Sequence, residues 1–461
     1  MNKYSKIKKI FFAGIGGSGM SGIAEVLHNM GFIVSGSDIA ESKSVKRLKK
    51  LGIKVFLGHD KKNVSDAETL VYSSAVTKDN VEVNAAKAKC IPVIPRAEML
   101  AELMRLKFSI AVAGTHGKTS TTSMLASIFN EAGTDPTYVV GGKLKTEESG
   151  AKLGSSDYLI AEADESDGSF LKLFPTIAII SNIENDHLDY YGDMENLLNS
   201  FAGFGNKVPF YGAVIINNGC NYSKQIIKNI KKKIISFGFD NTCNVIADKI
   251  EQSGFKSNFE LIINGDNQGK IELNTTGIHN IENALAAIAA AYEADIDIEH
   301  IKNGLKKFYL PDRRFQVLFY NKKYVIIDDY AHHPTEVKAT ISALKNGSYK
   351  RIIAVFQPHR FTRLKILMEE FKDAFAGLNK LIVAKLYSAN QEQIEEVTGN
   401  ALADKIIESG FSDVKYIDKF DDIPLFLEKE IREGDAIVFL SAGNLSDYAH
   451  KFAEIMEGKN R

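Results

Sequence analysis

The chain has 461 residues, of which 44% are hydrophobic and 25% are charged. This length is about three times that of a typical domain, which predicts several packed cores and excludes a peptide or a lone binding module. Lysines and arginines number 57 and aspartates and glutamates 58, so the net charge of −1 disfavours a general nucleic-acid coat protein. Any anionic ligand must be held by local positive groups and helix N-termini.

Neither the cysteines nor the apolar runs indicate secretion or membrane insertion. Cys90, Cys220 and Cys243 lie far apart without CxxC spacing, so we expect no disulfide framework and no structural zinc site. The apolar run after the basic start is short and is followed by no cleavage signature. Because no stretch approaches the ~20 apolar residues of a membrane span, we expect a cytoplasmic protein without stable membrane insertion.

Short apolar runs alternate with helix-like segments in the first part of the chain. The expected strands are 10–13, 32–34, 70–72 and 91–94, and the expected helices include 21–30 and 45–51. This alternation is typical of a parallel sheet covered by helices. It predicts a Rossmann-like domain over residues 1–107.

A second series of strands follows, with a helix expected over 120–130. Its strands are 108–113, 158–161, 177–180 and 213–216. Shorter alternating segments between about Lys233 and Leu273 predict an antiparallel patch of edge strands. We therefore expect a central domain over residues 108–311 with a parallel sheet, similar to a P-loop ATPase.

A third series predicts a Rossmann-like C-terminal domain over residues 312–461. Its strands are 324–327, 351–356, 381–384 and 436–440. The expected architecture is α/β in three domains, with boundaries near Lys107 and Pro311.

The first glycine-rich loop, Gly14-Ile-Gly-Gly-Ser-Gly19, follows a strand and precedes a helix. Its exposed backbone N–H groups can approach a pyrophosphate. Asp38, at the end of the next strand, has the spacing of an acidic residue that binds a ribose hydroxyl. Taken alone, this loop is compatible with NAD-type binding, with another phosphate ligand, or with a structural turn.

The second loop, Ala113-Gly-Thr-His-Gly-Lys-Thr119, also joins a strand to a helix. Its amides can wrap phosphates while Lys118 neutralises them and Thr119 contacts Mg²⁺, although only the GxxGKT half of the full P-loop pattern is present. Two phosphate-binding loops in successive domains argue against a simple dehydrogenase. They favour phosphoryl transfer or ATP-driven ligation.

Acidic residues and a histidine follow two strands of the central series. The segment Glu162-Ala-Asp-Glu-Ser-Asp167 can carry Mg²⁺ at the carboxyl edge of the sheet, and a solvated acidic loop is the alternative. His187 is expected at the same edge, where it would contact a metal or act as a base or hydrogen-bonding group. Imidazole suits Mn²⁺ or Zn²⁺ better than Mg²⁺, so the residues alone leave the metal open.

Two segments of the third series also lie at strand ends. They are Asp328-Asp-Tyr-Ala-His-His-Pro334 and Gln357-Pro-His-Arg-Phe-Thr-Arg363. Their arginines and histidines would suit a carboxylate or a phosphate, with a polar surface loop as the alternative.

Together, these motifs resemble the Mur ligases along nearly the whole chain. The segments that carry the resemblance are GIGGSGMS, AGTHGKTSTT, EADESDGSF, NIENDHLDYY, GIHNIENALAA, PDRRFQ, DDYAHHPTE and FQPHRFTR. In that family the three domains bind, in order, a UDP-sugar, ATP with Mg²⁺, and the incoming amino acid. ESDGSF and GIGGSGMS resemble the member that adds alanine.

The resemblance implies a set of site residues. The UDP diphosphate would contact Gly14, Gly16, Gly17, Ser18, Gly19 and Ser21, with Asp38 nearby. ATP would contact Gly114, Thr115, His116, Gly117, Lys118, Thr119, Ser120, His279, Asn280, Asn283, Arg314 and Asp329. Thr119, Glu162 and His187 would hold Mg²⁺, with Mn²⁺ and Glu165 as open alternatives. L-Alanine would contact Tyr330, His332, Arg360 and Arg363.

The implied reaction joins L-alanine to the lactyl carboxylate of UDP-N-acetylmuramate through an acyl phosphate and releases ADP and phosphate. Lys118, Glu162, His187 and His332 would be catalytic, and either histidine could deprotonate the amine. A recycling ligase that adds a whole peptide, a non-catalytic sensor of UDP-sugar and ATP, and a nucleotide-dependent oxidoreductase are the alternatives. We expect small-molecule partners, no nucleic acid, and a monomer or homodimer.

Overall fold

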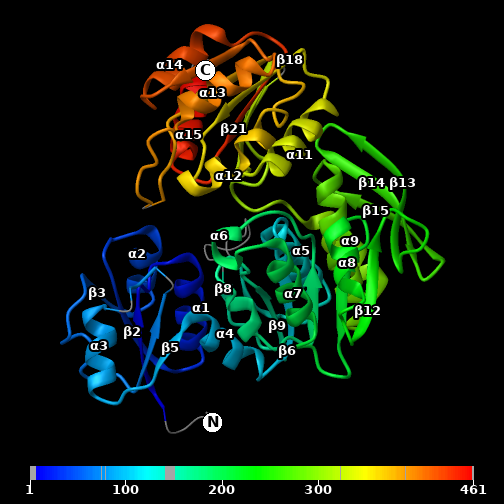
Figure 1. Ribbon diagram of the computed structural model, residues 1–461. Helices are drawn as coiled ribbons and strands as arrows, with labels where there is room; N and C mark the ends of the chain where they lie inside the picture. Colours follow the sequence, from blue (N-terminus) through cyan, green and yellow to red (C-terminus); the bar gives the residue numbers. More distant parts are fainter. Residues whose placement is uncertain are drawn as a thin grey trace. The chain divides into compact units, whose positions relative to one another are not determined.

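The computed structural model describes residues 7–73, 75–77, 79–140, 151–321, 323–389 and 391–458. Its strands form three sheets, of five, ten and six strands (Figure 1). The chain divides into two compact units. The first comprises Met1–Asp248, Glu260–Ile271 and Glu282–Phe308, and the second Lys249–Phe259, Glu272–Ile281 and Tyr309–Arg461.

The first sheet is parallel, in the order β3-β2-β1-β4-β5. Its strands are β1 (Lys9–Ala13), β2 (Ile33–Asp38), β3 (Lys54–Leu57), β4 (Thr69–Tyr72) and β5 (Val93–Pro95). The helices are α1 (Ser18–Asn29), α2 (Lys43–Lys50), α3 (Val81–Ala88) and α4 (Arg96–Met104). This strand order is that of a doubly wound sheet, which confirms the Rossmann-like expectation, although β3 was not predicted.

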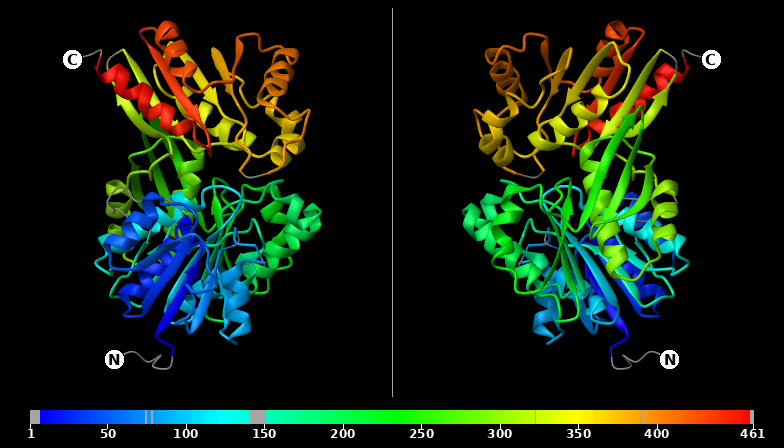
Figure 2. Two further views of the ribbon diagram at one scale, coloured as in Figure 1. Left: turned by 90° about the vertical axis from the view of Figure 1, so that its left-hand side faces the viewer. Right: turned by 90° about the vertical axis from the view of Figure 1, so that its right-hand side faces the viewer.

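Helices cover both faces of this sheet (Figures 1 and 2). Along β1, Phe11 packs in one core with Val83 of α3. Phe12 points to the other face and packs in a second core with Leu27 of α1. Because both faces are buried, the strands are continuous apolar runs, and the carboxyl ends of the strands remain as the place for ligands.

The second sheet has the order β15-β14-β13-β12-β11-β10-β6-β9-β7-β8. The strands are β6 (Phe108–Ala113), β7 (Thr137–Val139), β8 (Ala151–Lys152), β9 (Tyr158–Glu162), β10 (Ile177–Ile180), β11 (Ala213–Asn217), β12 (Lys233–Gly238), β13 (Val245–Ser253), β14 (Lys256–Ile263) and β15 (Asp266–Leu273). The helices are α5 (Lys118–Glu131), η1 (Ser169–Lys172), α6 (Leu188–Tyr191), α7 (Met194–Gly205), α8 (Asn221–Ile227), α9 (Ile278–Glu293) and α10 (Ile298–Lys307). The central strands, β11-β10-β6-β9, pair in parallel as expected.

The predicted antiparallel edge patch is confirmed for β14 and β15 and wrong for β12, and β13 pairs in parallel with β12. Only two residues connect β14 to β15, Asn264 at φ 50° and Gly265 at φ 91°. Two such residues form a tight hairpin turn, so these strands run antiparallel. In contrast, β12 pairs in parallel with β11 from Ala213↔Lys233 onward and extends the parallel core.

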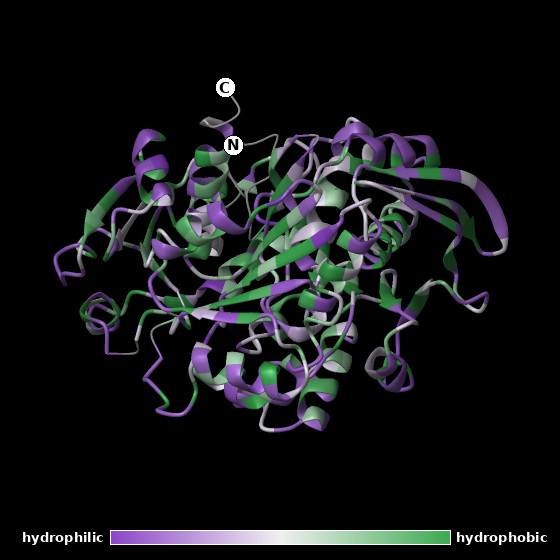
Figure 3. Cartoon of the chain, turned by 90° about the horizontal axis from the view of Figure 1, so that it is seen from above, coloured by the Kyte–Doolittle hydropathy of each residue, from purple (hydrophilic) through white to green (hydrophobic). Residues whose placement is uncertain are grey.

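The third sheet has the order β16-β17-β21-β18-β19-β20, with β16 antiparallel to β17 and the other pairs parallel. The strands are β16 (Gln316–Tyr320), β17 (Tyr324–Asp329), β18 (Arg351–Phe356), β19 (Lys380–Ala384), β20 (Val414–Ile417) and β21 (Asp435–Leu440). The helices are α11 (Pro334–Lys345), α12 (Phe361–Phe371), α13 (Gly399–Glu408), α14 (Asp422–Glu430) and α15 (Leu445–Gly458). The strands carry much of the hydrophobic sequence, as the green segments of Figure 3 show.

The expected boundaries fall between the sheets: Lys107 lies between α4 and β6, and Pro311 between α10 and β16. The assignment of three domains remains a prediction at this point. Within the described part of the chain, no helix has both the length and the apolar character that crossing a membrane requires.

Candidate functional site

The first glycine loop is fastened to the end of β2. The N–H groups of Gly14 and Ile15 both donate to the carbonyl of Ser37, each at 2.9 Å. Gly16 N donates to Oδ2 of Asp38 at 2.8 Å, and Ala40 N donates to Oδ1 of the same carboxylate at 3.2 Å. Asp38, predicted to bind a ribose, therefore holds the loop itself.

The helix that follows this loop begins without a side-chain cap. Gly17 is the N-cap and Ser18 the first residue of α1, and no side chain accepts a hydrogen bond at the cap. Gly19 lies in the same turn, and Ser21 is buried and donates its N–H to the carbonyl of Gly17. Uncapped N–H groups at a helix start form a site suited to an anion.

The second glycine loop needs both of its glycines. Gly114 has φ 140° and Gly117 φ 83°. A Cβ at Gly114 would lie 2.1 Å from Oγ of Ser181, and one at Gly117 would lie 2.1 Å from Oδ1 of Asn283. The strand, the positive φ angles and the following α5 give the loop the geometry that exposes backbone N–H groups to phosphate.

Asn182, to which the sequence analysis assigned no role, fixes this loop. His116 N donates to Oδ1 of Asn182 at 2.8 Å, and Nδ2 of Asn182 donates to the carbonyl of His116 at 3.0 Å. Thr115 N donates to the carbonyl of Asn182 at 3.2 Å. Asn182 follows β10, so the loop is tied to the neighbouring strand.

We expect Asn182→Ala to raise the KM for ATP about tenfold, because the His116 N–H loses its acceptor and the His116 carbonyl keeps only the Oγ of Ser181, so the loop loses its shape. Titrating ATP in a turnover assay measures this change. Asn229→Ala, at an exposed position, is the matched control. A KM equal to that of the wild type would show that the loop keeps its shape without Asn182.

Lys118, whose side chain is 19% exposed, lies among three oxygen acceptors. Its Nζ donates to the carbonyls of Gly114 at 2.6 Å and Thr115 at 3.3 Å, and to Oε1 of Glu165 at 2.7 Å. Burial alone would lower the pKa of Lys118, but the carboxylates of Glu165 and Asp164 outweigh it and raise that pKa. Lys118 is therefore a fixed positive charge at the second glycine loop.

Glu165 is only 2% exposed, and burial raises its pKa to about 7 even though Lys118 opposes the shift. Its Oε1 lies 3.8 Å from Nε2 of His187, and its Oε2 is buried without a hydrogen-bond partner. An orphaned carboxylate oxygen beside a histidine fits a site that accepts a cation.

The other predicted metal ligands lie around the same loop. Thr119 is the second residue of α5, and Glu162 ends β9. His187 has φ 59° and lies 3.5 Å from Oδ2 of Asp186. Burial would raise the pKa of Asp164, but Lys118, Ser166 and Arg96 together lower it. Glu162 stays a predicted metal ligand, with Glu165 as the alternative.

The two asparagines of α9 have different surroundings. Asn283 Oδ1 accepts a hydrogen bond from Oγ1 of Thr121 at 3.3 Å and faces Gly117, so it belongs to the second glycine loop. Asn280 donates to Oγ1 of Thr275 at 3.1 Å and to the carbonyl of Thr276 at 2.8 Å. These bonds stabilise the turn that precedes α9, and His279 is the second residue of that helix.

In the second unit, Tyr330 lies between two guanidinium groups. The Cζ atoms of Arg313 and Arg314 each lie 4.9 Å from the centre of its ring. Arg313 also donates to the carbonyls of Ser441 at 2.6 Å and Gly443 at 3.0 Å, and Arg314 Nη1 is 3.9 Å from Oε1 of Glu336. Arg313 thus anchors the segment that presents Arg314.

A row of rings continues from Tyr330. The ring centres are 5.3 Å apart for Tyr330 and His332, 5.5 Å for His332 and His359, and 5.6 Å for His359 and Tyr387. Nη1 of Arg363 lies 3.1 Å from Nδ1 of His359. His359, to which the sequence analysis assigned no role, therefore contacts both His332 and Arg363, which were predicted site residues.

Arg360 and Tyr387 are joined through the backbone. Arg360 N donates to the carbonyl of Tyr387 at 2.9 Å, and Tyr387 N donates to the carbonyl of Pro358 at 2.9 Å. Arg360 has φ 65°, an uncommon conformation for a non-glycine residue. Strain of this kind is found most often at ligand sites.

Asp329 is buried and accepts a hydrogen bond from Oγ1 of Thr340 at 2.5 Å. Burial raises its pKa to about 6 from an ordinary 3.8. The folded protein therefore binds this proton more tightly than the unfolded chain does. The associated stability is complete below about pH 4 and is lost as the pH rises from about 4 to 6.

We therefore expect Asp329→Asn to stabilise the protein at pH 8 by about 3 kcal/mol, since asparagine removes the buried charge. At pH 4 the difference should fall to a few tenths of a kcal/mol, because Asp329 is then protonated in the folded state and close to half protonated in the unfolded chain. Urea unfolding of both proteins at the two pH values measures this. Equal stability at pH 8 would contradict the raised pKa.

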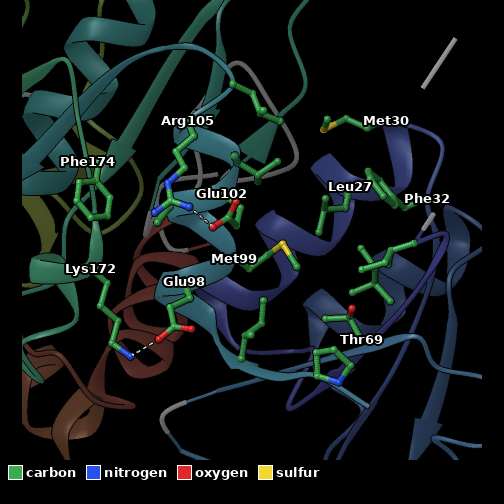
Figure 4. A pocket seen from close by; sticks show the side chains of 17 residues that line it. Leu27, Met30, Phe32, Thr69, Glu98, Met99, Glu102, Arg105, Lys172 and Phe174 are labelled. Carbon is green, nitrogen blue, oxygen red and sulfur yellow. Dashed lines mark hydrogen bonds and ion pairs between the residues drawn. The ribbon is translucent and has the colours of Figure 1, made fainter. Parts of the chain in front are cut away.

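A cavity of about 650 Å³ lies away from these residues. It is lined by parts of α1, α4 and the segment around η1, and Figure 4 shows its two ion pairs, Glu98 with Lys172 and Glu102 with Arg105. None of the predicted site residues lines it.

Known proteins resemble the chain over its whole length. The "Mur ligase family, catalytic domain" matches residues 9–108, the "Mur ligase middle domain" 112–291, and the "Mur ligase, glutamate ligase domain" 313–443. A UDP-N-acetylmuramate–L-alanine ligase of Sulfurihydrogenibium sp. (strain YO3AOP1) is 46% identical over 98% of this chain and 99% of the relative. The corresponding enzyme of Geotalea daltonii is 47% identical over 98% of each chain.

Solved structures agree with this grouping. The UDP-N-acetylmuramate-alanine ligase of Thermotoga maritima is 26% identical, with a TM-score of 0.83 over 98% of this chain and 99% of that chain. A murein peptide ligase of Psychrobacter arcticus, 23% identical with a TM-score of 0.69 over 97% and 98%, has the same fold. The chain belongs to the Mur ligase family, whose members are ATP-dependent ligases.

Proposed function

We propose that the protein joins L-alanine to the lactyl carboxylate of UDP-N-acetylmuramate through an acyl phosphate, with release of ADP and phosphate. The observation that carries this proposal is the 46% identity, over nearly the full length, to a ligase named for that reaction. The site also supports the proposal, because Lys118 is held at the second glycine loop beside a cluster of carboxylates.

We assign one ligand to each part of the chain. Residues 1–107 would bind the UDP-sugar at the uncapped start of α1, and residues 108–311 would bind ATP at the second glycine loop. Residues 312–461 would bind L-alanine, with Arg360 and Arg363 holding its carboxylate. The planar guanidinium group can bind both oxygens of a carboxylate. Nδ1 of His359 lies 3.1 Å from Nη1 of Arg363 and helps to position it.

Activation of the lactyl carboxylate depends on Lys118. A carboxylate oxygen is a poor leaving group, so it must first become part of an acyl phosphate, a mixed anhydride from which phosphate can leave. Lys118 neutralises charge on the γ-phosphate while the lactyl carboxylate attacks in line. When ATP is bound, Nζ of Lys118 would donate to a phosphate oxygen in place of Oε1 of Glu165. The low exposure of this site strengthens the electrostatic effect.

Thr119, Glu162 and His187 would hold Mg²⁺, and the orphaned Oε2 of Glu165 is an additional oxygen in the same cluster. Oxygen donors suit Mg²⁺, whereas the imidazole of His187 also accommodates Mn²⁺. When bound, the cation would neutralise charge that develops on the transferred phosphoryl group.

The amine of L-alanine must lose a proton before it attacks the acyl carbon, and His187 and His332 are the candidate acceptors. Nδ1 of His332 lies 2.8 Å from the carbonyl of Tyr330, which can only accept a hydrogen bond. Nδ1 therefore carries the proton in neutral His332, and Nε2 is the basic nitrogen. Nε2 of His187 lies 3.8 Å from Oε1 of Glu165 and 3.5 Å from Oδ2 of Asp186.

The product tests the assignment. Incubation with UDP-N-acetylmuramate, ATP, Mg²⁺ and either L-alanine or an alanine-initiated tripeptide should give a UDP-sugar that is heavier by one alanyl residue, and no tripeptide product. Starting from ¹⁸O-labelled lactyl carboxylate, one label should appear in the released phosphate. A tripeptide product alone would show a peptide-adding enzyme, and unlabelled phosphate would exclude the acyl phosphate.

A further inference from the structure

Arg96, the first residue of α4, brings a positive charge to the first glycine loop. A Cβ built on Gly19, in the first turn of α1, would lie 2.4 Å from Nη1 of Arg96 and 3.3 Å from its Cδ. Nη2 of Arg96 lies 3.3 Å from Oδ2 of Asp164, in the loop after β9. The guanidinium therefore lies between the start of α1 and the acidic loop.

The contact with Arg96 explains why residue 19 is glycine. Gly19 is absent from the described residues with positive φ, so its backbone conformation does not require glycine. Within a helix, alanine is preferred over glycine by about 1 kcal/mol. A side chain at position 19 would therefore take the space that the guanidinium of Arg96 occupies. Gly14, at φ 78°, has a conformational reason instead.

An anionic ligand at the first glycine loop needs a positively charged group beside it. Asp38, the charged side chain bonded to the loop, is negative and therefore opposes an anionic ligand. The N–H groups of the first turn of α1 attract an anion but carry only partial charge. A guanidinium beside them supplies a full positive charge in a planar fork that matches phosphate oxygens. Arg96 is 23% exposed, so solvent screens it only in part.

We propose that Arg96 is a substrate-binding residue that contacts the diphosphate of the UDP-sugar, and that Gly19 is small to make room for it. The proposal rests on the proposed UDP-sugar substrate and adds a residue to its binding site. In this arrangement Asp164 holds the guanidinium in place beside the first glycine loop.

UDP and uridine distinguish a phosphate contact from a structural role. Arg96→Ala should weaken UDP binding by about 10- to 100-fold, as expected for the loss of a charged hydrogen bond, and leave uridine binding unchanged. Arg96→Lys should lose less, because it keeps the charge without the fork. Calorimetry measures UDP, and ligand-observed NMR measures the weaker uridine. Equal weakening of both ligands would overturn the proposal.

Arg105 is the matched control, because it lies just after α4 and pairs with Glu102 on an exposed surface. Arg105→Ala should bind UDP as the wild type does. Thermal unfolding of each variant identifies any loss of folded protein. If Arg96→Ala does not fold, Arg96→Lys and the single variant Gly19→Ala still decide the question.

A double-mutant cycle tests the role of Gly19. Gly19→Ala should weaken UDP binding in the wild type by displacing Arg96, and should cost nothing further in Arg96→Ala. An equal cost in both backgrounds would show that Gly19 serves close approach of the backbone to the phosphates, and would overturn this part of the proposal. UDP binding requires neither ATP nor L-alanine, so failure of the ligase assignment leaves this test intact.

Discussion

Lys118→Met should lower the turnover number by about 10³-fold, because the variant lacks the fixed charge that neutralises the γ-phosphate. Lys118 makes three hydrogen bonds with carbonyls and Glu165, so its Nζ is placed before any ligand arrives. Preorganised charge of this kind acts in the transition state and not only on binding. Steady-state kinetics at saturating substrates measure the loss, and UDP binding should be unchanged.

Loss of the lysine also leaves Glu165 buried without its partner, which could lower activity through misfolding. The double variant Lys118→Met with Glu165→Gln removes that charge and should fold about as well as the wild type. It should remain as inactive as the single variant. Lys172→Met, which breaks an exposed pair with Glu98, is the control and should be fully active. Activity of Lys118→Met within tenfold of the wild type would contradict the role of Lys118.

Arg314→Ala should lower turnover by about 100-fold while changing UDP affinity less than twofold. The family resemblance implies that Arg314 contacts ATP when the third domain closes. Arg314 is held by Tyr330 and Glu336 in the second unit, whereas the first glycine loop belongs to the first unit. An interaction made only in the closed state affects the chemical step and not the binding of the first substrate.

Kinetics and UDP calorimetry on the same preparations separate these two effects. Arg432→Ala, at an exposed position of the same unit, is the control and should change neither. If Arg314→Ala lost turnover and UDP affinity in equal measure, Arg314 would act on the fold or on UDP directly. The closure argument would then be wrong.

The sequence predicted the inner strands and both loops because their signals are local. A buried parallel strand is an apolar run, and a glycine loop between strand and helix is contiguous in the chain. The strands that were not predicted include β3, β16 and β20. Each is an edge strand, with exposed or half-buried residues among its few positions, so its apolar pattern is weak.

Residue pairs from distant segments were beyond sequence reasoning. Arg96 and Asp164 are 68 positions apart, and no local pattern links them. Glu162 ends β9 and Glu165 lies in the loop that follows, and only the side-chain geometry shows that Glu165 is the partner of Lys118. Asn280 and Asn283 share a motif, yet only Asn283 faces the second glycine loop.

Phosphate release from the purified protein tests the central claim most directly. The complete mixture holds ATP, Mg²⁺, UDP-N-acetylmuramate and L-alanine, and each of the two acceptor substrates is omitted in turn. We predict sustained release in the complete mixture alone, because L-alanine is needed to consume the acyl phosphate and UDP-N-acetylmuramate to form it. Sustained release without the UDP-sugar, or none in the complete mixture, would contradict the assignment.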